Sequence, residues 1–233
     1  MSLRYKILVI TTFAIAMGFS ESAVVVYLRG ILYPDGFAFP LSPVPVNLAL
    51  TELFREMATV VMLVTIGIVA ARKFSTGFAW FIYSFAIWDI FYYVFLKLIL
   101  DWPESIFTWD VLFLIPTTWT GPVLSPVLVS MTMILLALVI LSQAEKGNNT
   151  RILWQEWVAF IAGSLVLILG FVFDYSQHML THFNVGGMLQ LKNPEVLELA
   201  TRYIPSRFPW WIFGIGEVII LGTIGVYRRR VSR

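Results

Sequence analysis

The amino-acid sequence predicts an all-α protein, a single polytopic domain over residues 1–233 in which about six helices form a transmembrane bundle. The chain is 59% hydrophobic and only 13% charged, whereas soluble chains are nearer a quarter charged. A water-soluble domain of this size cannot bury so much apolar surface, but a bilayer accepts it. Apolar stretches of about 20 residues also recur along the chain, and this length crosses a hydrocarbon layer.

Six stretches have the length of a membrane span. The first is preceded by Arg4 and Lys6, as a signal peptide would be, but its apolar run continues through Tyr27 and is too long for a typical signal sequence. We therefore expect a spanning helix there. The predicted spans cover residues 6–28, 48–71, 77–100, 122–142, 153–176 and 208–227.

The basic residues predict the orientation of these spans. If the N-terminus is inside, ten of the sixteen basic residues fall in short cytoplasmic segments, as the positive-inside rule requires. We therefore expect both termini in the cytoplasm and the chain in a cell membrane, the inner membrane of a bacterium or archaeon. The ten residues are Arg4, Lys6, Arg72, Lys73, Lys146, Arg151, Arg228, Arg229, Arg230 and Arg233.

Three longer outer connections follow from this topology. Residues 33–47 hold too many prolines for a helix and should be extended. The apolar run 106–116 is too short to span, and tryptophans surround it, so we expect a re-entrant or interfacial helix there. Asn193, Pro194 and Glu195 form a helix-start pattern, which predicts a short amphipathic helix to about Tyr203.

Ionisable residues inside the predicted spans mark a candidate site. Such residues cost about 2.5–3.5 kcal/mol each on insertion scales and usually face the bundle interior. Most of the acids fall in the outer half, so we expect an outward-opening polar pocket, with structural hydrogen bonding between helices as the alternative. The candidate residues are Glu21, Glu52, Glu56, Asp89 and Glu217, with Arg55 as a charge partner three residues from Glu52.

A second candidate site contains the two histidines of the chain. Asp174, His178 and His182 are spaced by four residues and would share one face if the helix continued to Gly186. Histidine pairs at this spacing hold zinc, copper or iron. Two turns of a straight helix cover about 12 Å, so at most two of the three could bind one ion. The alternative is that these side chains simply meet water or lipid headgroups.

Other features narrow the range of functions. The aromatic residues around Asp89 could line a site for a quinone, a carotenoid or a lipid chain, although packing is the commoner reason for such density. The chain has no cysteine, which removes disulfides and thiolate metal sites. Its basic residues form no continuous stripe, so nucleic acid is not an expected partner.

Three functions fit these observations. The first is a membrane-embedded enzyme, with or without a divalent metal, that acts on a lipid or quinone-like molecule in the outer pocket. The second is a small proton-linked transporter that uses Asp89 and Glu217 near the membrane midplane. The third is a non-catalytic subunit that helps to assemble or anchor a larger membrane complex.

Overall fold

Six long helices dominate the computed structural model, which describes residues 2–114, 117–188 and 193–232. All six are long and apolar enough to cross a membrane, so the chain is a multi-pass membrane protein, as predicted. Most extend a few residues beyond the predicted spans, because a helix need not end where the hydrocarbon does. They are α1 (Leu3–Leu32), α2 (Val46–Ala70), α3 (Phe74–Leu100), α4 (Leu124–Glu145), α5 (Trp154–Leu180) and α8 (Trp210–Val231).

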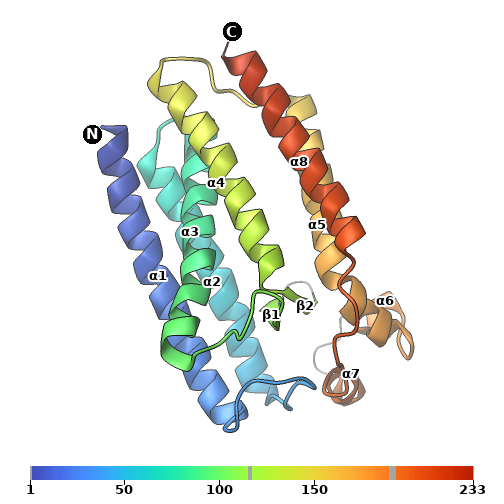
Figure 1. Cartoon of the computed structure of the whole chain (residues 1–233). Helices are drawn as coiled ribbons and strands as arrows, with labels where there is room; N and C mark the ends of the chain where they lie inside the picture. Colours follow the sequence, from blue (N-terminus) through green and yellow to red (C-terminus); the bar gives the residue numbers. More distant parts are fainter. Residues whose placement is uncertain (1, 115–116, 189–192, 233) are drawn as a thin grey trace.

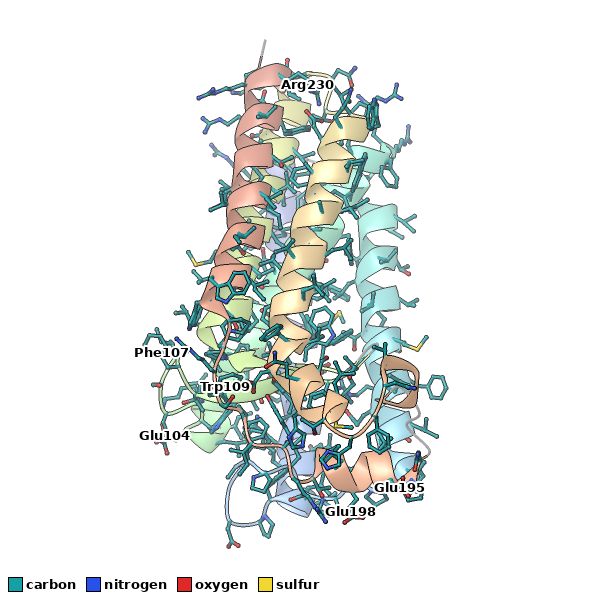
Figure 2. The ribbon with its side chains drawn as sticks, turned by 90° about the vertical axis from the view of Figure 1, so that its right-hand side faces the viewer. Glu104, Phe107, Trp109, Glu195, Glu198 and Arg230 are labelled. Atoms are coloured by element: carbon teal, nitrogen blue, oxygen red, sulfur yellow. The ribbon has the colours of Figure 1, made fainter. Side chains whose placement is uncertain are left out.

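The long helices run side by side, and both termini lie at one end of the bundle (Figure 1). We call this the terminal end. The opposite end carries the strands β1 (Trp109–Phe113) and β2 (Trp119–Pro122) and the short helices α6 (Val185–Met188) and α7 (Pro194–Ala200), and we call it the hairpin end. Figure 2 shows Arg230 at the terminal end and Glu104, Trp109 and Glu195 at the hairpin end.

Helix α3 organises the first part of the bundle, because α1, α2 and α4 all pack against it. Helix α5 packs mainly against α8, and α8 also contacts α4. The crossing of α2 and α3 is close: a Cβ atom added to Gly67 would lie 2.6 Å from the backbone oxygen of Gly77. Small residues allow such approaches between membrane helices.

The largest apolar core lies toward the terminal end. It is formed by side chains of α1, α3, α4, α5 and α8, with Trp80, Ile140 and Tyr227 almost fully enclosed. Two smaller clusters lie at the hairpin end. One joins α5 to α7 and the segment after it, and the other surrounds Phe208 and Phe213 at the start of α8. These clusters fix the long connection between α5 and α8 on the bundle.

The helix predicted at 106–116 is wrong. The described part of this segment contains β1, which pairs antiparallel with β2, so that Trp109 lies opposite Pro122 and Asp110 opposite Gly121; Pro116 lies outside the described residues. A short apolar run does not distinguish helix from strand by its periodicity. Pairing with β2 satisfies the backbone groups of β1, which matters because buried backbone needs partners.

The other outer connections agree better with expectation. Residues 33–45 contain no helix or strand, as their prolines predict, but α2 already begins at Val46, within the predicted extended segment. Helix α7 starts at Pro194 as predicted but ends at Ala200, before Tyr203. Its Val196 and Leu199 are buried against Tyr175 and Met179, so its apolar face packs on the protein itself.

Candidate functional site at the hairpin end

The hairpin of β1 and β2 lies inside the bundle. Asp110 and Thr120 are almost completely buried, and Trp119 stacks on Phe171 of α5 with ring centroids 5.8 Å apart. The backbone N–H of Leu114, just after β1, reaches the third turn of α2. Within a membrane, non-helical backbone occurs only where protein buries it or where it lines a cavity.

The Leu114 N–H donates to Glu56 Oε2 at 3.0 Å. Glu56 follows the start of α2 by ten residues, which places it about 15 Å along that helix. Its side chain is buried and lies within electrostatic range of Glu21 and Glu52. One of the predicted pocket residues therefore holds the hairpin in position.

Arg55 joins α1 to α2. Its Nε donates to Glu52 Oε2 at 2.7 Å, which is the pair that the three-residue spacing predicts, and its Nη1 donates to Glu21 on α1. The side chains of Arg55, Glu21 and Glu52 retain 22%, 12% and 13% of their exposure. These three side chains are therefore not fully enclosed.

Asp89 and Glu217 contact α4 from two different sides. Ser130 Oγ donates to Asp89 Oδ2 at 2.8 Å, and Thr132 Oγ1 donates to Glu217 Oε2 at 2.8 Å. Ser130 and Thr132 are two residues apart, and at 3.6 residues per turn this separates them by about 200° around the helix. The structure therefore does not bring Glu217 to Asp89, although the sequence analysis grouped them.

The ion pair between Arg29 and Asp110 was not predicted from the sequence. Arg29 Nη2 lies 3.1 Å from Asp110 Oδ1, and the two residues are 7% and 2% exposed. The guanidinium also lies over the rings of Trp102 and Phe37, at 3.7 and 4.3 Å from their centroids. The only sequence feature that could have pointed to this pair is Asp110 itself, an acid inside the apolar run 106–116.

Burial raises the pKa of the Asp110 carboxyl to about 6, and the charge of Arg29 lowers it in part. The Val111 N–H and the hydroxyls of Tyr93 and Tyr92 act in the same direction as Arg29. Arg29 Nη1 and Asp110 Oδ2 are both buried; among the described residues the nitrogen donates no hydrogen bond and the oxygen accepts none. One donor atom of Arg29 and one acceptor atom of Asp110 thus remain available for a hydrogen bond.

Two adjacent tyrosines lie near these groups. The rings of Tyr92 and Tyr93 lie 4.8 Å apart. Tyr92 is within electrostatic range of Asp110, Arg29, Glu21 and Arg55, and Tyr93 is within range of Asp110 and Asp89. We call the connected set the acidic cluster. It comprises Glu21, Glu52, Glu56, Asp89 and Asp110, together with the basic residues Arg29 and Arg55.

The candidate metal residues do not converge. Asp174 accepts hydrogen bonds from the Tyr203 hydroxyl at 2.8 Å and from Ser206 Oγ at 2.7 Å. His178 Nε2 lies 3.1 Å from the Leu199 oxygen, and His182 Nδ1 lies 2.6 Å from Thr181 Oγ1. Each side chain has a separate partner.

Helix α5 also ends at Leu180, before His182, so the helix expected to continue to Gly186 is wrong. Thr181 Oγ1 donates to the carbonyl of His178 as the helix ends. Because His182 lies beyond the end of α5, its four-residue spacing from His178 no longer places the two side chains on one helix face. In the described part of the chain, no group of three or more histidine, aspartate or glutamate side chains is arranged to hold a metal ion.

Comparison of this chain with protein-family models, curated proteins and solved structures found no match. The interpretation of the acidic cluster therefore rests on its own geometry.

Proposed function

We propose that the acidic cluster is the functional site and that it takes up protons or small cations from the side of the membrane that the hairpin end faces. The observation that carries this proposal is an excess of acids: five carboxyl groups accompany two guanidinium groups. Buried carboxylates without cations are costly, so they bind a proton or a cation.

The distribution of partners supports this interpretation. Arg55 pairs with Glu21 and Glu52 and balances one of their two charges, and Arg29 pairs with Asp110. Glu56 and Asp89 have only a backbone N–H and a serine hydroxyl as donors among the described contacts. They are therefore the groups best placed to exchange a proton.

The hairpin gives a second reason. Non-helical backbone inside a membrane bundle is a recurring feature of ion and substrate sites in transporters. Here it contributes Asp110 and contacts Glu56. Arg55 and Glu21 keep part of their exposure, which would provide access.

A proton-linked carrier is thus the function that this geometry favours. Asp89 would exchange the proton, whereas Glu217, on the other side of α4, would act separately from it. We further propose that the terminal end faces the cytoplasm, because nine described basic residues lie in its segments: Arg4, Lys6, Arg72, Lys73, Lys146, Arg151, Arg228, Arg229 and Arg230.

Proton uptake by purified protein in nanodiscs tests this proposal. On acidification from about pH 8 to about pH 6, ordinary carboxylates stay ionised, so uptake beyond that of histidines and the N-terminus reports on perturbed acids. Both histidines are replaced by glutamine to remove their contribution. In that background, Glu56→Gln and Asp89→Asn should each reduce the uptake.

Glu104→Gln is the matched control, because Glu104 is exposed at the hairpin end and should leave the uptake unchanged. Equal uptake in the parent, Glu56→Gln and Asp89→Asn proteins would contradict the proposal. A liposome experiment with a pH dye inside then tests carriage. Proton entry above that of empty liposomes, lost in Asp89→Asn, supports a carrier; binding without entry contradicts a carrier and favours a subunit of a larger complex.

A further inference from the structure

A pocket of about 610 Å³ opens at the terminal end of the bundle. It lies between the turn that joins α2 to α3 and the loop that joins α4 to α5. It is remote from the acidic cluster and has no part in the proposed proton uptake. The residues that matter for its chemistry are Lys73, Phe74, Asn149, Arg151, Trp154 and Trp157.

Buried hydrogen bonds hold the base of this pocket. The hydroxyls of Ser75 and Thr150 lie 2.9 Å apart, and the Tyr227 hydroxyl donates to the Thr150 carbonyl oxygen at 3.0 Å. Arg230 Nη2 donates to the Arg151 carbonyl oxygen at 2.7 Å. These contacts connect the α4–α5 loop to α3 and α8, so the pocket walls are fixed.

The pocket is positively charged. Lys73 and Arg151 are exposed, and neither side chain forms an ion pair or a hydrogen bond with another described residue. Glu156, on the first turn of α5, is already neutralised by Arg230 at 2.7 Å. Helix α3 also begins beside Lys73 with no side-chain cap, so its first N–H groups add positive potential.

The other wall of the pocket is aromatic and faces outward. Phe74 and Trp154 are 77% and 71% exposed, and Trp157 packs between Phe74 and Phe78, with centroids at 6.0 and 4.9 Å. Tryptophans are enriched where a bilayer meets water. We therefore expect this wall at the level where headgroups give way to acyl chains.

We propose that this pocket binds an anionic phospholipid. Its phosphate would lie between Lys73 and Arg151, and its acyl chains would lie along Trp154 and Phe74. Basic pockets between membrane helices bind acidic headgroups in this way. Free phosphate would use the same two cations but would leave the exposed aromatic wall without a role, which is why we favour the lipid.

Lipid retention tests this proposal. The full-length protein is purified from membranes into nanodiscs that contain equal amounts of phosphatidylcholine and phosphatidylglycerol, and tightly bound lipid is counted by native mass spectrometry. The wild-type chain should retain phosphatidylglycerol preferentially. Lys73→Gln/Arg151→Gln should lower this preference roughly tenfold to thirtyfold, since each basic residue near an acidic lipid contributes about 1 kcal/mol.

Arg228→Gln/Arg229→Gln is the matched control, because it removes the same charge from exposed positions at the same end and should leave the preference within about twofold of wild type. Lys73→Gln alone, a change at an exposed residue, tests the idea if the double variant does not fold. Glycerol phosphate, the headgroup without chains, should not displace the lipid.

Three results would overturn the proposal. The first is no preference for phosphatidylglycerol in the wild-type chain. The second is an equal loss in the control variant, which would indicate general surface charge. The third is full displacement of the lipid by glycerol phosphate, which would indicate a site for a free phosphate compound.

Discussion

Removing Arg29 should destabilise the protein in a strongly pH-dependent way. Arg29→Met keeps the length of the side chain but leaves Asp110 without its cation, in a place where only 2% of that residue is exposed. Removing one partner of a buried ion pair lowers the free energy of unfolding by about 3–5 kcal/mol. The Asp110 carboxyl can avoid part of this cost by binding a proton, so the loss depends on pH.

The direction follows from the pKa values. In the wild-type fold the pKa of Asp110 is about 6, above its ordinary value of 3.8. The folded chain binds this proton more tightly than the unfolded chain, so this group lowers stability as pH rises from about 4 to about 6 and has no further effect above that range. Arg29 lowers this pKa, and without it the pKa lies above 6.

In Arg29→Met the fall in stability therefore continues above pH 6. The gap from wild type should widen by up to about 1.4 kcal/mol per pH unit. Between about pH 5.5 and about pH 7.5 the gap widens by at most about 2 kcal/mol, because only the part above pH 6 counts. The free energy of unfolding, measured by titration with sodium dodecyl sulfate in mixed micelles at both pH values, gives the gap directly.

A double variant supplies the control. Arg29→Met/Asp110→Asn removes both charges, and replacing a buried pair by neutral groups costs much less than breaking it. Its gap from wild type should therefore not widen above pH 6. A gap for Arg29→Met that is equal at the two pH values would refute this reasoning, as would a double variant with the same pH dependence as the single one.

Two further predictions concern packing and charge at the terminal end, both measured as the unfolding midpoint in mild detergent. Gly67→Ala should destabilise the folded protein by about 1–3 kcal/mol through overpacking, because the added Cβ would lie 2.6 Å from a backbone oxygen of α3. Gly222→Ala is the control, because its Cβ would meet nothing within 4 Å. Equal midpoints for the two variants would argue against the close crossing of α2 and α3. Arg230→Met should cost about 1–3 kcal/mol, because Glu156 is only 6% exposed and loses its cation while Arg230 itself is partly exposed. The exposed Arg228→Met is its control, and a matching loss in both variants would count against this ion pair.

Hydropathy was sufficient to predict the membrane spans. All six helices overlap the predicted stretches, from Leu3–Leu32 to Trp210–Val231, because about 20 apolar residues satisfy both the bilayer and the backbone only as a helix. The pairing of Glu52 with Arg55 was also predictable, since residues three apart on a helix are neighbours.

The hairpin and its ion pair depend on long-range contacts that the sequence does not encode locally. The run 106–116 has the composition of a short helix or of a strand, and its partner strand at Trp119–Pro122 decides between them. Asp110 finds Arg29 across 81 positions of the chain. Likewise, Glu217 and Asp89 were grouped because both lie near the middle of their predicted spans. In the structure they contact different sides of α4, through Thr132 and Ser130.

Thiol reactivity at Glu52 tests most directly whether an acidic, accessible cluster exists at the hairpin end. The chain has no cysteine, so Glu52→Cys provides a single reactive site, and Val185→Cys, which is exposed in α6, gives the intrinsic reactivity of each reagent. Relative to Val185→Cys, Glu52→Cys should react faster with a cationic thiosulfonate than with an anionic one of similar size, because four carboxyl groups of the cluster remain. Equal relative rates for the two reagents, or no reaction from the hairpin side, would contradict the account.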